Sequence, residues 1–149
     1  MILEALLEQN ILSAFAELPE LSGAQIIASR SATKTEDSDN CYIAIAAGFR
    51  QHDSFSLSPV TIPVSISIVS RVEGDAKASN HMDVVETIAD KLSYWHKFGD
   101  VMQEKLSSEK CTANELRMDG GTNSVYDDAQ QIWTDTINIT IRGAEKFAE

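Results

Sequence analysis

The residues of this 149-residue chain that could bind a metal ion or act as a nucleophile are three histidines and two cysteines. His52, His81 and His96 lack the i, i+4 spacing and the paired cysteines from which zinc sites and facial triads are built. We therefore expect solvated or helix-capping histidines. Cys41 falls in an apolar stretch and Cys111 has no histidine fixed near it by sequence, so we expect reduced, structural thiols rather than a nucleophile.

Two pairs of aspartates are the candidates for carboxylate chemistry. Asp37 and Asp39 start like a calcium-binding loop, but Cys41 occupies the position of the third ligand and the glycine of the turn is missing. Asp127 and Asp128 indicate a polar loop, because the spacing places no further acidic group to share a hydrolytic reaction. The chain also lacks the glycine patterns of hydrolases, P-loops and dinucleotide-binding folds. The sequence thus predicts no catalytic, cofactor-binding or metal-binding residue, and a protein that is not an enzyme.

Two long strands are the elements that would dominate the fold. Alternation of apolar and polar residues predicts strands over residues 59–71 and 133–142. Residues 41–50 are small and apolar on both sides, which predicts a strand in the middle of the sheet. Shorter strands are expected over residues 24–29 and 112–118.

Two amphipathic helices accompany these strands. Apolar residues at spacings of three and four predict helices over residues 2–17 and 80–95, with Glu4 and Glu8 on the polar face of the first. The remaining segments are a polar loop or hairpin tip over residues 30–40, a link over 51–58, a helical turn over 101–106 and a turn at 119–121.

Together these elements predict an α+β fold in a single domain, residues 1–149. We expect a mainly antiparallel or mixed sheet of about five strands against two principal helices, in the order α-β-β-β-α-β-β. The length and the 43 % hydrophobic content suit a core of that size. The chain has neither a signal-peptide pattern nor a membrane-length apolar run, so we expect synthesis in the cytoplasm and no membrane partner.

The net charge of −11 bears on the partners of the protein. Stable binding to nucleic acid needs clustered lysines and arginines, so such binding is disfavoured. Solubility alone explains an acidic surface. An acidic surface also suits a passage through which DNA slides without being held.

Apolar residues at loop positions are the clearest indication of a binding surface. Phe55 and Leu57 stand in a polar link, and Val125 and Tyr126 follow another polar loop; they either contact another protein or fold back over the sheet. Pro63 cannot donate to a sheet ladder, which predicts an edge or a bulge and a partly unpaired segment. We therefore expect protein contacts, through strand augmentation, at Phe55, Leu57, Val60, Pro63, Val125 and Tyr126.

The order of elements resembles that of the tail terminator, or tail-completion, proteins of long-tailed bacteriophages and prophages. The resemblance lies in the helix over residues 2–17, the strand 61–71 running through Val-Glu-Gly-Asp into the helix 80–95, and the closing strand 132–141. It covers most of the chain and carries over no single functional residue. It implies a structural protein of the virion tail or neck, made in the host cytoplasm, that forms a homo-oligomeric ring, commonly of six subunits. Such a ring caps the tail tube and joins it to the head connector, and DNA passes through it.

Two alternatives stay open at this point. A head–tail connector or neck component would differ from a terminator only in the position of its ring. A hotdog-like thioesterase or small-ligand-binding protein would wrap its sheet around the helix 80–95, but the sequence arranges no acidic residue with a helix N-terminus for a thioester site.

Overall fold

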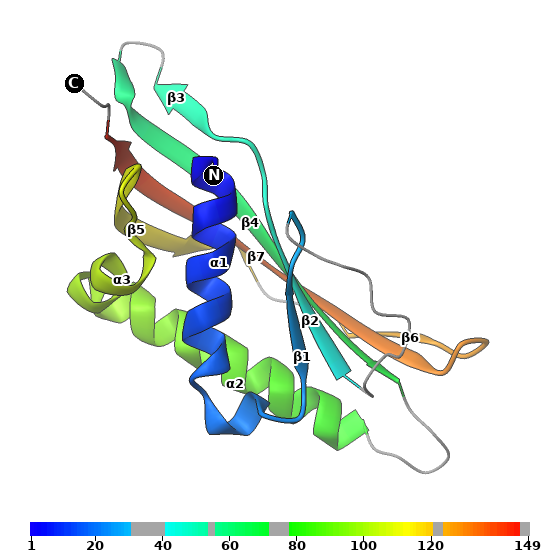
Figure 1. Cartoon of the computed structure of the whole chain (residues 1–149). Helices are drawn as coiled ribbons and strands as arrows, with labels where there is room; N and C mark the ends of the chain where they lie inside the picture. Colours follow the sequence, from blue (N-terminus) through cyan, green and yellow to red (C-terminus); the bar gives the residue numbers. More distant parts are fainter. Residues whose placement is uncertain (31–40, 54–55, 72–77, 121–123, 147–149) are drawn as a thin grey trace.

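A mixed seven-stranded sheet with helices against one face makes up this computed structural model (Figure 1). The structure describes residues 1–30, 41–53, 56–71, 78–120 and 124–146; the polar segment 31–40, Phe55, Asp37 and Asp39 lie outside them. The elements are α1 (Leu3–Ala16), the 3-10 helix η1 (Pro19–Leu21), β1 (Gln25–Ala28), β2 (Cys41–Ala47), β3 (Gln51–Asp53), β4 (Ser56–Arg71), α2 (Ala78–Lys97), α3 (Gly99–Leu106), β5 (Cys111–Met118), β6 (Val125–Asp127) and β7 (Ile132–Glu145).

The strand order is β1-β2-β4-β7-β5, with β3 also paired to β4 and β6 to β7. Only the β1–β2 pairing is parallel among the described strands; the others are antiparallel. The α+β class and the mixed sheet are therefore confirmed, as is the interior position of β2. The strand count exceeds the expected five because β3 and β6, three residues each, are too short to show a period of two.

Pro63 lies on an interior strand, which corrects the expectation of an edge strand, whereas the expected irregularity is present as a break in the pairing on one side of β4. β4 pairs with β7 along residues 59–71, and on its other side pairing with β2 ends at Val64 while pairing with β3 begins at Thr61. Gly48 donates its N–H to the Pro63 carbonyl oxygen at 2.7 Å on that second side. The nitrogen and the carbonyl oxygen of one strand residue point to the same side of the strand. The Pro63 nitrogen therefore points away from β7, toward the break between β2 and β3, where no ladder hydrogen bond is needed. The proline thus removes no hydrogen bond from the β4–β7 ladder.

The hydrophobic core lies between the inner face of the sheet and the helices α1 and α2. Inward side chains of β2 and β4, such as Ile43 and Ile66, are fully buried, and each contributes about 1.5–3 kcal/mol to stability. Phe15 of α1 stacks on Trp95 of α2 with ring centroids 5.8 Å apart and planes within 5°. This aromatic pair joins the two helices across the core.

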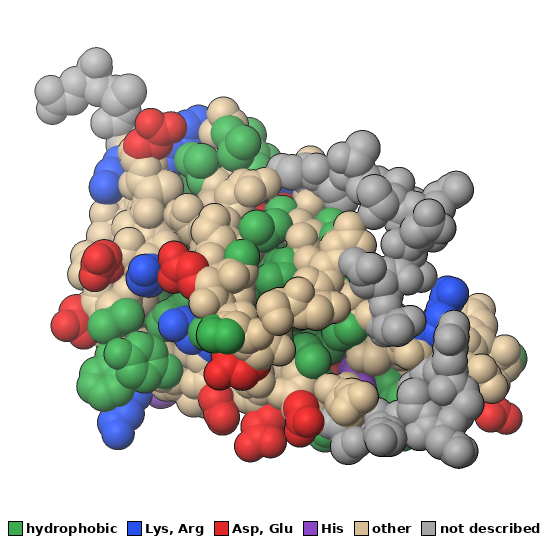
Figure 2. Space-filling model, turned by 60° about the horizontal axis from the view of Figure 1, so that its bottom comes forward, with side chains coloured by type: hydrophobic (Ala, Val, Ile, Leu, Met, Phe, Trp, Pro, Cys, Tyr) green, Lys and Arg blue, Asp and Glu red, His purple; other side chains and the backbone are tan. Residues whose placement is uncertain are grey.

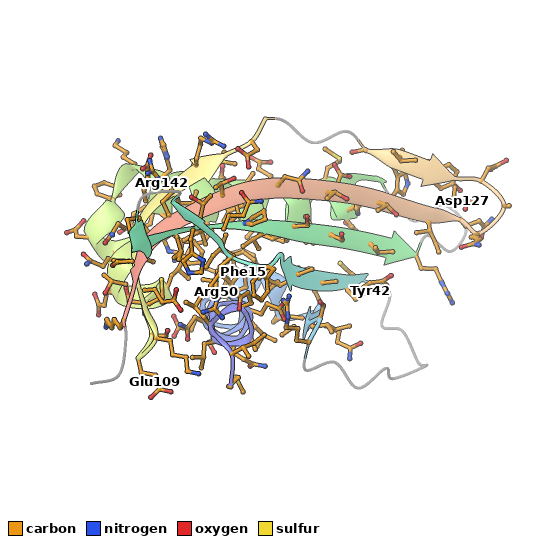
Figure 3. All side chains as sticks on the ribbon, turned by 90° about the horizontal axis from the view of Figure 1, so that it is seen from above. Phe15, Tyr42, Arg50, Glu109, Asp127 and Arg142 are labelled. Carbon is orange, nitrogen blue, oxygen red and sulfur yellow. The ribbon has the colours of Figure 1, made fainter. Side chains whose placement is uncertain are left out.

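The outer face of the sheet carries small polar side chains. Seen from above, α1 lies on one side of β4 and β7, and short side chains occupy the other (Figure 3). Ser65 Oγ donates to Asn138 Oδ1 at 2.9 Å across these two strands. No described helix is long and apolar enough to span a membrane.

Glycine at position 143 allows β5 to approach β7 closely. The register of these strands shifts between Ala113 and Glu115, opposite this position. A Cβ at Gly143 would collide with the Thr112 carbonyl oxygen and lie 2.9 Å from the Cys111 sulfur. The backbone carbonyl cannot retreat without breaking the ladder, so the position excludes a side chain.

We expect Gly143→Ala to lower the free energy of unfolding by about 2 kcal/mol, because the new methyl group overpacks this contact. Gly23→Ala is the matched control, since a Cβ there meets nothing within 4 Å, and it should change stability by less than about 1 kcal/mol. Denaturant-induced unfolding measures both variants. Equal stabilities for the two would contradict the close approach.

Candidate functional site

Two buried carboxylates on α1 hold the region where β2 gives way to β3. Glu4 and Glu8 are both 0 % exposed. Glu8 accepts hydrogen bonds from the N–H of Ala47 at 2.8 Å and of Arg30 at 3.0 Å, and from the Arg30 guanidinium. Glu4 accepts from the Arg50 N–H at 3.0 Å and from the Arg50 guanidinium at 2.8 Å. The expectation that both glutamates face solvent is wrong, because arginines and backbone donors compensate their burial.

This cluster continues to the surface through Arg50. The Arg50 guanidinium also donates to Glu145 at 2.6 Å, and Glu145 lies 2.7 Å from His52 Nε2. Burial raises the pKa of Glu4, but the hydrogen bonds from Arg50 outweigh it and leave the pKa below its usual value. The pKa of Glu145 is likewise lowered, because His52 and Arg50 outweigh the opposing effect of burial. Glu4 and Glu145 are therefore ionised at neutral pH, and their contacts with Arg50 and His52 join α1, β3 and β7.

A second buried cluster consists of Ser70, His81 and Asp135. His81 Nδ1 lies 2.7 Å from Ser70 Oγ, and His81 Nε2 lies 2.6 Å from Asp135 Oδ1. His81 and Asp135 are each 1 % exposed, and Ser70 is 8 % exposed. The expectation of a solvated or capping histidine is wrong for His81, although His52 and His96 are exposed. The signal that could have found the cluster is Asp135, which takes an inward position in the alternation of β7.

The Ser70–His81–Asp135 cluster has the composition of a hydrolytic triad but not its arrangement. In serine hydrolases the serine contacts Nε2 and the aspartate contacts Nδ1, and here the two nitrogens are exchanged. Ser70 Oγ also donates to the sulfur of Cys41 at 3.6 Å, and the Ser70 residue is 8 % exposed. The geometry supports a polar link that fixes the start of α2 to β4 and β7.

The other candidate chemical groups take structural positions. Cys41 and Cys111 are free thiols, as expected, and burial raises the pKa of both, which makes them poor nucleophiles. Asp127 accepts hydrogen bonds from the N–H groups of Ala129 and Gln130, and so closes the turn after β6. Within the described residues, no group of three or more His, Cys, Asp or Glu could hold a metal ion.

The predicted contact residues do not form one surface. Val60 is 2 % exposed and belongs to the core, which corrects its assignment to a surface contact, whereas Pro63 is exposed on the outer face. Val125 and Tyr126 are 62 % and 39 % exposed on β6. Val125 pairs with Thr134 and Pro63 with Thr140, so the two sites are about 20 Å apart along β7. Leu57 lies in β4.

A further exposed surface, which the sequence did not indicate, lies where α2 meets α3. Tyr94 and Phe98 are 45 % and 41 % exposed, with ring centroids 4.8 Å apart. Lys91 Nζ lies 5.5 Å from the centre of the Tyr94 ring, and Lys97 Nζ lies 5.6 Å from that of Phe98. Figure 2 shows hydrophobic side chains gathered beside basic ones at this end of the molecule. We call Lys91, Tyr94, Lys97 and Phe98 the aromatic surface.

Comparison with protein-family models finds no match for this chain, and comparison with curated proteins finds none either. Among the described residues, the buried carboxylates and His81 join elements of the fold, and exposed apolar groups lie at the ends of the molecule.

We expect Glu4→Gln to lower the free energy of unfolding at pH 7 by roughly 3 kcal/mol, because Arg50 then loses its buried partner. The pKa of Glu4 is lowered in the folded state, so the unfolded state binds more protons as the solution is acidified. This stabilisation is complete above the unfolded pKa, about 4.3, and is lost as pH falls through the lower folded pKa. Denaturant unfolding at a series of pH values should give a flatter acid limb for the variant.

The control for this change is Glu17→Gln. The Glu17 side chain is 66 % exposed and lies 3.6 Å from Lys105, so its loss should cost less than about 1 kcal/mol. A Glu4→Gln variant as stable as Glu17→Gln would contradict the bridging role of Glu4.

A structural role for the Ser70 cluster predicts that fluorophosphonate probes do not label Ser70. Ser70→Ala should lower the free energy of unfolding by roughly 1–2 kcal/mol, because His81 loses a buried hydrogen-bond partner. Ser65→Ala, on the same strand but on the outer face, is the matched control and should cost less than about 0.5 kcal/mol. Probe labelling that disappears in Ser70→Ala would instead identify a catalytic serine.

Proposed function

We propose that this protein is a structural component of a virion tail or neck, a terminator-type protein that assembles with itself into a ring. The observation that carries the proposal is the hairpin of β6 and β7, which extends beyond the helices (Figure 1). This hairpin presents Val125 and Tyr126 to solvent, 62 % and 39 % exposed. Exposed apolar side chains on a projecting element are typical of protein contact surfaces.

A projecting hairpin favours contact between neighbouring copies of the chain. Identical subunits that join through two different surfaces form a ring when the rotation between neighbours closes. The resemblance to tail terminators suggests six subunits, capping the tail tube and meeting the head connector.

The charge of the chain supports a passage for DNA rather than a DNA-binding role. A net charge of −11 gives a ring of six subunits a strongly acidic character. The exposed outer face of the sheet adds uncharged groups such as Thr136 and Asn138. Stable DNA binding depends on basic groups that displace counterions from the phosphates. A lumen lined by acidic and uncharged groups would lack them and would let DNA pass.

The two alternatives fare differently against the geometry. A connector or neck component uses the same kind of ring, so the same observations support it. A hotdog-like ligand-binding protein wraps its sheet around one central helix, whereas here α1 and α2 both cover the same face of the sheet (Figure 1). The ring proposal therefore has the stronger support.

We expect the purified protein to form rings whose proportion rises with concentration, because subunit contacts follow mass action. Multi-angle light scattering measures the mass, which should be a whole multiple of the 16.3 kDa protomer, and negative-stain microscopy shows the ring. Binding to isolated tail tubes rather than to connector-bearing heads would favour a terminator. A protein that stays monomeric at high concentration and binds neither would contradict the proposal.

A further inference from the structure

We propose that the β6–β7 hairpin of one subunit docks on the aromatic surface of the next copy of this chain. The hairpin tip consists of Val125, Tyr126, Asp127 and Asp128, all of them exposed. The inference rests on the proposed ring and specifies the contact that builds it.

The aromatic surface is a rigid platform. The Tyr94 carbonyl oxygen accepts the N–H of Phe98 at 2.8 Å, and the Phe98 carbonyl oxygen accepts N–H groups of Val101 and Met102 at 3.1 Å. These bonds fix the backbone at the junction of α2 and α3, and the Tyr94 and Phe98 rings contact each other with centroids 4.8 Å apart. A surface that is already ordered loses little conformational entropy on association.

The hairpin tip is also ordered. The Tyr126 ring packs against Trp133 with centroids 4.9 Å apart, and Asp127 closes the turn through two backbone hydrogen bonds. The tip therefore offers an apolar patch beside two carboxylates in a fixed arrangement.

The charges of the two surfaces are complementary. The tip carries Asp127 and Asp128 beside its apolar residues, whereas the aromatic surface carries Lys91 and Lys97 beside its rings. The chain has only 12 basic residues against 23 acidic ones, so most of its surfaces would repel an acidic tip. An apolar centre flanked by opposite charges is the pattern of a specific protein interface.

The two surfaces lie at opposite ends of the molecule. In Figure 1 the hairpin lies at one end and the junction of α2 with α3 at the other, and Figure 3 shows the same separation between labelled Asp127 and α3. The tip of one subunit cannot reach the aromatic surface of the same subunit. Two subunits joined through this contact leave one tip and one aromatic surface unoccupied. The contact is therefore head-to-tail and repeats until a ring closes.

The test uses one variant on each side, Tyr126→Asp in the tip and Phe98→Asp in the aromatic surface. Each alone should raise the dissociation constant for self-association by about tenfold or more, because it places a charge in the apolar centre. Mixed in equal amounts, the two variants should form heterodimers that grow no further. The Phe98→Asp chain keeps an intact tip and the Tyr126→Asp chain keeps an intact surface, so only one contact can form.

A second pair of substitutions reverses charges at exposed positions, where a change of side chain does not disturb the core. Lys97→Glu and Asp128→Lys should each weaken association, and the chain that carries both should associate more tightly than either single variant. Lys110→Glu makes the same charge change at an exposed position outside the aromatic surface and should leave association unchanged. Thermal melts check that each variant folds.

Sedimentation velocity on all these proteins tests the ring and this particular contact separately. Wild-type protein that fails to oligomerise overturns the ring and this contact together. Wild-type rings that persist unchanged in Phe98→Asp or Tyr126→Asp overturn the contact alone and leave the ring intact. Mixtures of the two variants that stay monomeric also overturn the contact, because they show that tip and surface do not pair.

Discussion

The unbroken ladder between β4 and β7 is the constraint on which the rest of the structure depends. It runs in one register from Pro59↔Ala144 to Arg71↔Ile132, and every other strand except β1 pairs with one of these two. Its inner face carries the apolar side chains that α1 and α2 cover, and its far end continues into the hairpin with β6. Pro63 is tolerated there because its nitrogen faces the change of partner from β2 to β3, away from β7.

The buried carboxylates of α1 accept hydrogen bonds from backbone N–H groups that no neighbouring strand pairs. Pairing of β1 with β2 ends at Ala28↔Ile45, and just beyond it Glu8 accepts the N–H of Ala47 in place of a further strand residue. Buried carboxylates are costly when bare, but the oxygens of Glu8 also receive hydrogen bonds from Arg30. The position of α1 on the sheet is thus fixed by these charged hydrogen bonds as well as by apolar packing. Apolar packing alone would fix it less precisely.

Elements with a sustained period could be predicted from the sequence, and contacts between distant residues could not. The helix expected over residues 80–95 is α2, and the alternation over 133–142 lies within β7, because periodicity in one segment reflects burial of one face. The inward turn of Glu4 and the pairing of Ser70 with His81 depend on partners from other elements. Only Asp135, a charge at an apolar position, marked such a partner. The expectation of an edge strand at Pro63 was wrong because a proline lacks one hydrogen-bond donor, but the sequence does not show on which side of the strand that donor is absent.

Among the described residues, the ionisable groups that are buried are used to hold the fold, and this shapes what the protein can do. Glu4, Glu8 and Asp135 are each bound by donors from other elements, and Ser70 is enclosed with His81. A substrate would have to displace bonds on which the position of α1 or α2 depends, at the cost of stability. Exposed rings at Tyr94 and Tyr126 depend on no such bonds for the fold and remain free to meet another chain. Association through these ends would require no rearrangement of the core, because the exposed rings are not among the bonds that position α1 and α2.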